Sequence, residues 1–360
     1  MIPPKRQRLL KIGCGVLLLA VVVIVAVQRV NNDQPHSLER ILDSAVSSIE
    51  RIRTYSCITQ SYLAVDEQIF PWTLDRMRNE AVLSPTGEAM VSEYRCLCNR
   101  EQGWLKCEGK EYGTPEGEDK PYWSEFNGAY DGVRYRTFMP SRNVGQQLTD
   151  GSDIHGRASI NILLGDGMGG MGKTQGSLLY WLRLKDGGWT LEGHTEIGDP
   201  LVSRIYQTDF YQSKMIVRAT LSSKHGYLPR RIETTWLDTN TSCEVIEVTE
   251  FHQAGEDSIW IPIRGTYQGF YRHAVFPDGI SGEQYDQMSS QARSEIDKAI
   301  RFVARPLQQM RTFTIAADSL RINMELSRED FTIEFPPDAK IYDQATDQTP
   351  TWGVIPCRKM

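Results

Sequence analysis

The stretch Ile232-Glu233-Thr234-Thr235-Trp236 decides the fold class, because its side chains alternate between two environments. In an extended chain, Ile232, Thr234 and Trp236 lie on one face, and Glu233 and Thr235 lie on the other. The stretch 331–335 has the same period, with Phe, Ile and Phe sharing one face. One buried face and one wet face are typical of an antiparallel sheet, so we expect a mainly β fold of the α+β class.

The same alternation, together with short connections rich in Gly, Pro, Asn and Asp, predicts strands along most of the chain. They lie near residues 54–65, 72–82, 88–99, 103–108, 130–138, 189–195, 201–210, 214–222, 228–238, 243–252, 258–271, 311–318 and 330–336.

Helices are predicted at three places. Ser37 can cap a helix whose apolar residues recur at helical spacing from Leu38 to Ile52. Ser281-Gly282-Glu283-Gln284 has the form of a capping box, and the apolar stripe that follows runs to Val303, before Pro306. A short apolar helix is expected over 178–184. No repeat and no low-complexity linker divides this part of the chain, so a single body is expected.

The N-terminal region predicts a membrane segment. Ile12 to Val27 is an unbroken apolar run that follows a basic cluster. We expect an uncleaved anchor, with a signal peptide cleaved after Ile24-Val25-Ala26 as the alternative. Because the basic residues precede the run, the N-terminus stays in the cytoplasm and the body lies outside. The expected organisation is a basic tail at 1–11, a transmembrane anchor at 12–28, a linker at 29–36 and the body at 37–360.

The charge of the body argues against nucleic acid as a partner. Residues 1–30 hold five of the 40 Lys and Arg residues and no acid, which leaves 35 basic and 46 acidic side chains, a net charge of −11. A nucleic-acid-binding surface needs a positive face that displaces counterions.

The spacing of the cysteines predicts one pair close enough to form a disulfide. Residues 94–98 alternate, 99–103 read as a turn, and 104–107 return, so Cys96 and Cys107 lie opposite each other within bridging distance. We expect a disulfide between them, because the body is placed in an oxidising compartment. Buried thiols are the alternative, and a zinc site is disfavoured because no histidine lies nearby.

One motif fits a phosphate-binding loop. Residues 167–174, Gly-Met-Gly-Gly-Met-Gly-Lys-Thr, match G-x-x-x-x-G-K-[ST]. Three observations oppose nucleotide binding: the following strands read as antiparallel, no apolar run ending in Asp supplies the magnesium partner, and the body lies outside the cytoplasm.

We interpret the glycine-rich loop as a lid instead. Glycines make it adaptable, and its methionines are flexible apolar side chains. The expected lid and cavity residues are Leu163, Leu164, Met168, Met171, Leu178, Leu179 and Trp181. A surface loop that packs its methionines on the core is the alternative. The histidines lack metal-ligand spacing and no nucleophile motif is found, so we expect no catalysis and no cofactor.

The order of these features resembles the LolA/LolB/RseB superfamily of lipoprotein carriers and lipid-sensing proteins. The local phrases that carry the resemblance are 130–136, 226–233, 259–267 and 331–338. They span most of the body, and the larger membrane-anchored members in planctomycete-type bacteria are the most similar. The resemblance implies an unclosed antiparallel β half-barrel with covering helices over an apolar cavity, in a single-pass protein of the bacterial inner membrane.

The resemblance implies a function as well. A retained anchor departs from the diffusible carriers of the superfamily, which are cleaved and shorter. We therefore expect a membrane-anchored extracytoplasmic protein that binds lipid or lipoprotein acyl chains without catalysis. An envelope sensor or scaffold that binds a protein partner is the alternative, and a nucleotide binder at 167–174 is a third hypothesis.

Overall fold

The computed structural model describes residues 37–65, 88–113, 122–148, 159–165, 177–184, 186–207, 214–237, 240–270, 272–275, 280–281, 284–285, 287–297, 301–304 and 309–343. The chain divides into two units, Met1–Ile41 and Leu42–Met360. The expected anchor at 12–28 and the expected strand at 72–82 lie outside the described residues. Within them, no helix combines the length and apolarity that crossing a bilayer requires.

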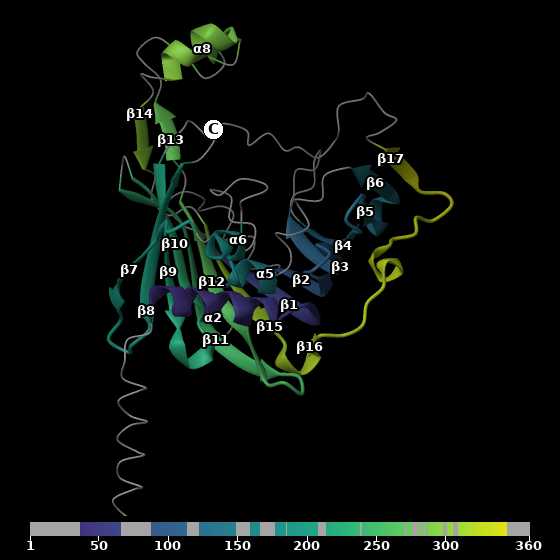
Figure 1. Cartoon of the computed structure of the whole chain (residues 1–360). Helices are drawn as coiled ribbons and strands as arrows, with labels where there is room; N and C mark the ends of the chain where they lie inside the picture. The colour runs from purple at the N-terminus through teal and green to yellow at the C-terminus, as the bar shows by residue number, and fades with distance from the viewer. Residues whose placement is uncertain are drawn as a thin grey trace, which may run out of the picture. The chain divides into compact units, whose positions relative to one another are not determined.

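The second unit is built on one large, open sheet (Figure 1). Its strands are β1 (Thr54–Val65), β2 (Ala89–Asn99), β3 (Trp104–Gly113), β4 (Tyr122–Tyr130), β5 (Tyr135–Met139), β6 (Val144–Leu148), β7 (Trp189–His194), β8 (Pro200–Gln207), β9 (Lys214–Ser222), β10 (Leu228–Trp236), β11 (Thr241–Ala254), β12 (Ile259–Gly269), β15 (Gln309–Ile315), β16 (Arg321–Ile322) and β17 (Lys340–Asp343). Every pairing is antiparallel except that of β17 with β6. The expected mainly β, unclosed antiparallel architecture is confirmed.

The strand order consists of two meanders joined by a single strand. Strands β1 to β6 pair in sequence order, and so do β7 to β12. Strand β15 lies between β1 and β12, with Ile315 opposite Thr59 and Phe313 opposite Gly265. The sheet ends at β17 on one edge and at β7 on the other.

The two faces of the sheet differ in chemistry. We call the face to which Thr59, Val217 and Phe313 project the inner face; all three side chains are buried. The opposite, outer face carries cross-strand ion pairs, including Arg218 with Glu192 at 3.3 Å. One wet and one buried face is the arrangement that the alternating sequence predicts.

Helix α2 (Leu38–Glu50) forms where the sequence predicts it. Its first turn is capped by Ser37, whose Oγ accepts a hydrogen bond from the Arg40 N–H at 3.4 Å. At its C-terminal end, Arg100 Nη1 donates to the carbonyl oxygens of Ile49 and Ile52 at 2.9 and 3.4 Å. A basic side chain at the last carbonyls stabilises a helix end.

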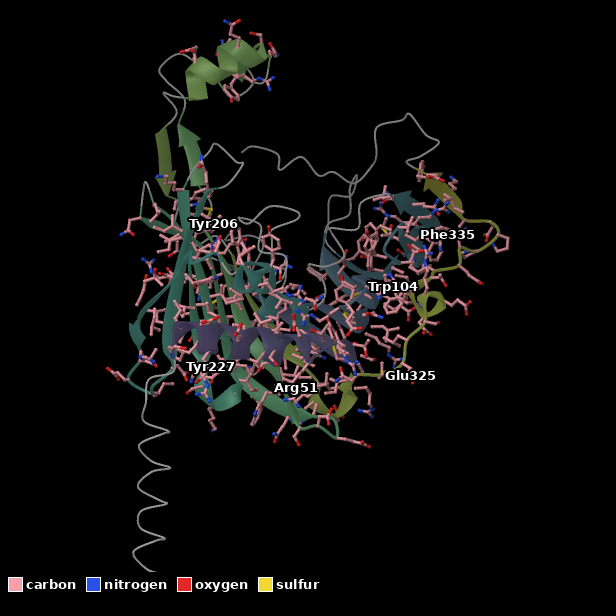
Figure 2. The ribbon with its side chains drawn as sticks, viewed as in Figure 1. Arg51, Trp104, Tyr206, Tyr227, Glu325 and Phe335 are labelled. Carbon is pink, nitrogen blue, oxygen red and sulfur yellow. The ribbon has the colours of Figure 1, made fainter. Side chains whose placement is uncertain are left out.

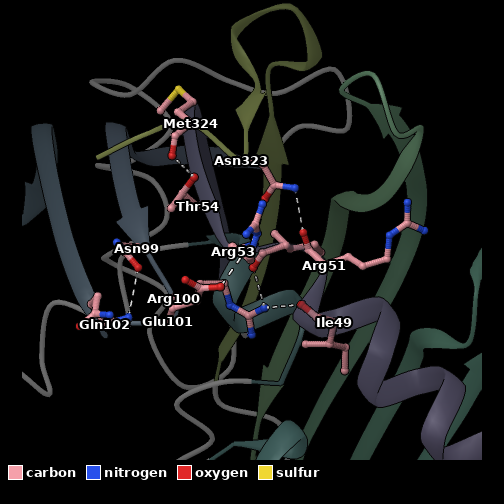
Figure 3. A network of polar contacts seen from close by, with 11 residues as sticks. Ile49, Arg51, Arg53, Thr54, Asn99, Arg100, Glu101, Gln102, Asn323 and Met324 are labelled. Carbon is pink, nitrogen blue, oxygen red and sulfur yellow. Dashed lines mark hydrogen bonds and ion pairs between the residues drawn. The ribbon is translucent and has the colours of Figure 1, made fainter. Parts of the chain in front are cut away.

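The same region ties the start of β1 to the C-terminal part of the chain (Figure 3). The Asn323 side chain accepts from the Arg53 N–H at 3.1 Å and donates to the Arg51 carbonyl at 3.0 Å. Thr54 Oγ1 donates to the Met324 carbonyl at 2.8 Å. These bonds fix the point at which residues 323–339, which we call the strap, leave the sheet after β16.

The prediction of a strand at 330–336 is wrong. Residues Arg328–Phe331 form a short 3-10 helix, η5, and the chain runs on without a strand partner. Its alternating aromatic residues pack on the outer face of β3 to β6 instead. Phe331 is buried and packs on Trp104 with ring centroids 5.6 Å apart, and the half-buried Phe335 packs on Phe138 at 6.2 Å. Figure 2 labels Trp104 and Phe335. An alternating pattern reports one buried face, and here the strap buries that face without joining the sheet.

Other boundaries also differ from the predicted ones. Strands β4, β6, β16 and β17 are missed by the sequence analysis, as is the separate hairpin of β13 (Arg272–Val275) and β14 (Arg301–Ala304). The capping box at Ser281 and Gln284 is confirmed, with N–H to side-chain bonds of 2.8 and 3.2 Å. The predicted helix, however, is α8 (Ser290–Asp297), and Val303 pairs with His273 as a strand residue.

Removing the Phe331 ring is expected to weaken the fold. Its side chain is 1% exposed and contacts Trp104. A buried Phe→Ala change costs about 3–5 kcal/mol, because it removes apolar contacts and leaves a cavity. Urea unfolding of Phe331→Ala should show a loss of this size. Ile341→Ala, at a site 49% exposed, is the control and should change stability little; equal effects of the two substitutions would contradict the packing role of the strap.

The strap should also detach at low pH. Burial acts to raise the pKa of Asp131, but N–H groups of Arg134 and Val133 and the Arg328 guanidinium hold the pKa below its usual value. A carboxyl group with a depressed pKa stabilises the fold above its unfolded pKa and loses that contribution as the pH falls through its folded pKa. Asp131→Asn should therefore destabilise the protein at neutral pH and reduce its sensitivity to acid, measured by urea unfolding between about pH 2 and 7. Unchanged sensitivity would exclude this linkage.

Candidate functional site

Helix α5 (Ser159–Leu163) is held against the inner face by polar side chains at its start. Ser159 Oγ hydrogen-bonds to Thr59 Oγ1 of β1. Asn161 accepts from the Tyr55 hydroxyl at 3.1 Å and donates to Cys98 Sγ at 3.7 Å. All these groups are buried and out of contact with water, so each hydrogen bond satisfies a polar group that water cannot.

Helix α6 (Leu178–Arg183) lies over the other meander. Its Trp181 packs against Tyr206 of β8 in a tilted arrangement, with ring centroids 4.9 Å apart, and the Arg204 guanidinium lies 5.2 Å from the Trp181 ring. The Trp189 indole N–H donates to the Trp181 carbonyl at 2.9 Å. Arg183 also pairs with Glu50 of α2 at 2.7 Å.

Two glycines allow the helices to approach the sheet closely. Gly165 has a φ of +84°, and a Cβ added there would lie 2.6 Å from Ile232 Cδ1. A Cβ on Gly265 of β12 would lie 2.6 Å from Leu163 Cδ2 of α5. The Leu178 N–H donates to the Gly165 carbonyl at 3.0 Å, which links the start of α6 to the end of α5. Figure 1 shows both helices on the same side of the sheet.

The residues expected to form a lid and cavity fall into three groups. Leu163 of α5, Leu164 directly after it, and Leu178 and Trp181 of α6 are buried, and Leu179 is half-buried on α6. Met168 and Met171 lie outside the described residues, as does the loop 167–174. Four of the five described residues therefore belong to two neighbouring helices that cover the inner face, and Leu164 directly follows the first helix. Because the apolar stretch before the loop is helix α5, the strand that precedes a phosphate-binding loop is not found there.

A row of thiols lies on the inner face. Register places Cys57 of β1 opposite Cys96 of β2, and Cys96 opposite Cys107 of β3. The Cys96 and Cys107 sulfurs are 3.1 Å apart. The disulfide itself stays a prediction, with Cys57 as a second neighbour on the other side of Cys96.

The environment of these thiols suppresses their reactivity. Burial, with Cys107 and Cys98 nearby, raises the pKa of the Cys57 thiol far above its usual range. The hydrogen bond with Cys107, followed by burial, raises the pKa of Cys96, and burial raises the pKa of Cys98 to about 12. Since the thiolate is the nucleophile, the raised pKa values make reduced Cys57, Cys96 and Cys98 unreactive at neutral pH. Among the residues that the structure describes, no group of three or more His, Cys, Asp and Glu side chains is arranged to hold a metal ion.

Sequence reasoning missed a second row on the inner face. Arg204, Val217, Thr234 and Glu244 lie opposite one another on β8 to β11. The three polar members are buried. A threonine between Ile232 and Trp236, on the face that the alternation assigns to the interior, was the signal that could have found this row.

The fold and the site together define a protein with an open antiparallel sheet whose inner face is covered by short helices. Two solved structures are similar to it: a DUF1329 family protein from Desulfovibrio piger, at 8% identity and a TM-score of 0.38, covering 81% of this chain and 95% of that one, and an uncharacterised conserved protein from Thermus thermophilus, at 8% identity and a TM-score of 0.27, covering 86% and 100%. No protein-family model and no curated protein matches the sequence.

The thiol row makes a chemical prediction. Peptide mapping without reduction should show Cys96 linked to Cys107. After reduction of the folded protein, iodoacetamide at neutral pH should leave Cys57, Cys96, Cys98 and Cys107 unlabelled, because all four side chains are buried and out of reach of the reagent. Cys243, which is half-buried, is the internal control and should react faster. Linkage of Cys96 to Cys57, or labelling of the row at the rate of Cys243, would contradict this account.

Proposed function

We propose that this protein is a membrane-anchored extracytoplasmic binding protein that holds the acyl chains of a lipid or lipoprotein between the inner face of its sheet and helices α5 and α6. The observation that supports the proposal is the cover of the inner face. Buried aliphatic and aromatic residues of both meanders face helices of only five and six residues. Elements this short have little stability of their own and depend on what they pack against.

The free energy gained by burying an acyl chain exceeds the cost of separating helix α5 from the sheet. The side-chain hydrogen bonds that hold α5 to the sheet include the Ser159–Thr59, Asn161–Tyr55 and Asn161–Cys98 contacts. At about 1 kcal/mol net per bond, separating these contacts costs about 3 kcal/mol. An acyl chain contributes about 0.8 kcal/mol for each buried CH₂, so roughly ten methylenes supply more than twice that amount. The chain would also replace the apolar contacts that Leu163 and Leu164 lose.

The proposal takes the open sheet as a half-barrel of the LolA/LolB/RseB type, with the anchor keeping it at the membrane. It assigns no chemical step to the protein. Helix α6, with Leu178 and Trp181, would stay attached to the sheet edge while α5 moves, because the Trp189 indole of β7 is hydrogen-bonded to the Trp181 carbonyl.

The full chain, extracted from membranes into amphipol, should carry acyl lipid that solvent extraction and mass spectrometry detect. Leu163→Asp and the milder Leu179→Asp place a charge at the covered surface and should reduce the bound lipid at least threefold. Ile205→Asp is the matched control, because Ile205 is 58% exposed on the outer face. It corrects for annular lipid around the anchor.

Equal lipid content in wild type, Leu179→Asp and Ile205→Asp would refute the proposal, provided that thermal unfolding shows each variant to be folded. Absence of lipid together with a reproducible stoichiometric protein would favour the sensor alternative instead.

A further inference from the structure

One basic side chain of the inner face is buried where α6 meets the edge of the sheet. The Arg204 side chain is 9% exposed, and its guanidinium lies 5.2 Å from the Trp181 ring. The guanidinium also lies against Gly188, since a Cβ added there would come within 2.8 Å of Arg204 Cζ. Packing against a ring and a glycine holds the planar guanidinium in one orientation, and a fixed guanidinium recognises carboxylates by its paired donors.

The carboxylate that this guanidinium binds in the structure belongs to Asp186. Arg204 Nη1 donates to Asp186 Oδ1 at 2.7 Å, and Nη2 donates to Oδ2. These bonds, followed by a hydrogen bond from the Gly188 N–H, hold the pKa of Asp186 below its usual range. The Asp186 side chain is 52% exposed, so water competes for its charge. Arg204 is therefore paired with a carboxylate that another carboxylate can replace.

The guanidinium has one donor that Asp186 does not engage. The Arg204 Nε–H is buried and has no hydrogen-bond partner among the residues that the structure describes. A buried donor without an acceptor is destabilising and calls for an explanation. A carboxylate that approached along the Nε edge would accept from Nε and from one Nη at the same time, which is a bidentate pairing.

Apolar surface begins directly beside Arg204. Val217 of β9 lies opposite Arg204, and Thr234 of β10 follows at roughly 10 Å, two strands away at the usual spacing. Val217 and Leu178 of α6 are fully buried. An acyl chain whose head group binds Arg204 would therefore run beneath α6, over Val217, toward β10.

We propose that Arg204 is the head-group site of the acyl ligand and binds the carboxylate of a fatty acid, which displaces Asp186 from the guanidinium. One guanidinium balances one negative charge, so a singly charged carboxylate suits it better than a doubly charged alkyl phosphate. The displaced Asp186 is solvated, because residues 186–188 are exposed. This inference rests on the proposed function and specifies the chemistry of its ligand.

The test compares three probes of equal chain length at neutral pH: decanoate, decanamide and decyl phosphate. Decanamide has the shape of decanoate without its charge. The full chain is held in a non-ionic amphipol, so that no carboxylate of the polymer competes, and binding is measured by calorimetry. Wild type should bind decanoate about tenfold more tightly than decanamide, and no less tightly than decyl phosphate.

Two substitutions should act in opposite directions on the binding of decanoate. Arg204→Gln removes the guanidinium and should abolish the preference for decanoate, with the affinity for decanamide unchanged within about twofold. Asp186→Asn removes the charge of the internal competitor and should raise decanoate affinity about threefold or more, with no change for decanamide. Glu192→Gln is the matched control, because Glu192 pairs with Arg218 at 3.3 Å on the outer face; it should change neither affinity.

The test stays decisive if the buried position tolerates no change. Thermal unfolding must show that Arg204→Gln is folded. If it is not, Asp186→Asn decides alone, because loss of a purely structural ion pair would not produce a gain in decanoate affinity.

Equal affinity of wild type for decanoate and decanamide would overturn this inference and leave the proposed function standing. Tighter binding of decyl phosphate than of decanoate, or a decanoate affinity that does not rise in Asp186→Asn, would overturn it too. Failure of all three probes to bind would overturn the proposed function itself.

Discussion

Pairing of β15 with both β1 and β12 is the constraint on which the rest of the structure depends. Each meander forms from neighbouring hairpins, but the two become one sheet only when residues 309–315 fill the place between them. Phe313 then stands opposite Ser61 on one side and Gly265 on the other. This pairing is long-range, and it creates the surface on which α5 sits, because α5 contacts β11, β12 and β15 and bonds to β1.

The inner face combines tight packing with a thin cover. Gly165 and Gly265 allow the helices to lie almost on the strand backbone, so leucines of α5 and α6 fill the space over the sheet. The cover is nonetheless short, and its polar anchors are few. Under the proposed function, an acyl chain would take the place of the leucines of these weakly anchored helices on the apolar surface of the sheet.

The sequence predicts the parts of this fold in which local pattern and tertiary packing agree. The limits of β1 are predicted at 54–65, where alternation coincides with a buried and a wet face, and Ser37 begins α2. Strands β4 and β6 were missed because Gly128 and the Gly-Gln-Gln run of 145–147 have low strand propensity, and pairing with β3 and β5 overrides it. The alternation of Phe331 and Phe335 predicted a strand that does not form, because these side chains pack on the sheet from a segment that lies outside it. Of the site, Leu163, Leu178 and Trp181 are predicted as neighbours, but strand register, which the sequence does not reveal, was needed to bring Glu244 beside Thr234.

Hydrogen exchange along the full chain tests the central claim, that the inner face opens at α5 and α6 to take an apolar ligand. Amides of α5 and α6 should exchange at least a hundredfold faster than those of β15, because opening the cover requires far less than unfolding the sheet. Addition of a saturating amphiphile should slow exchange on the inner face of β9 to β12 and leave β15 unchanged. Exchange of α5 at the rate of β15, with no response to the amphiphile, would show a permanently closed core and contradict the account.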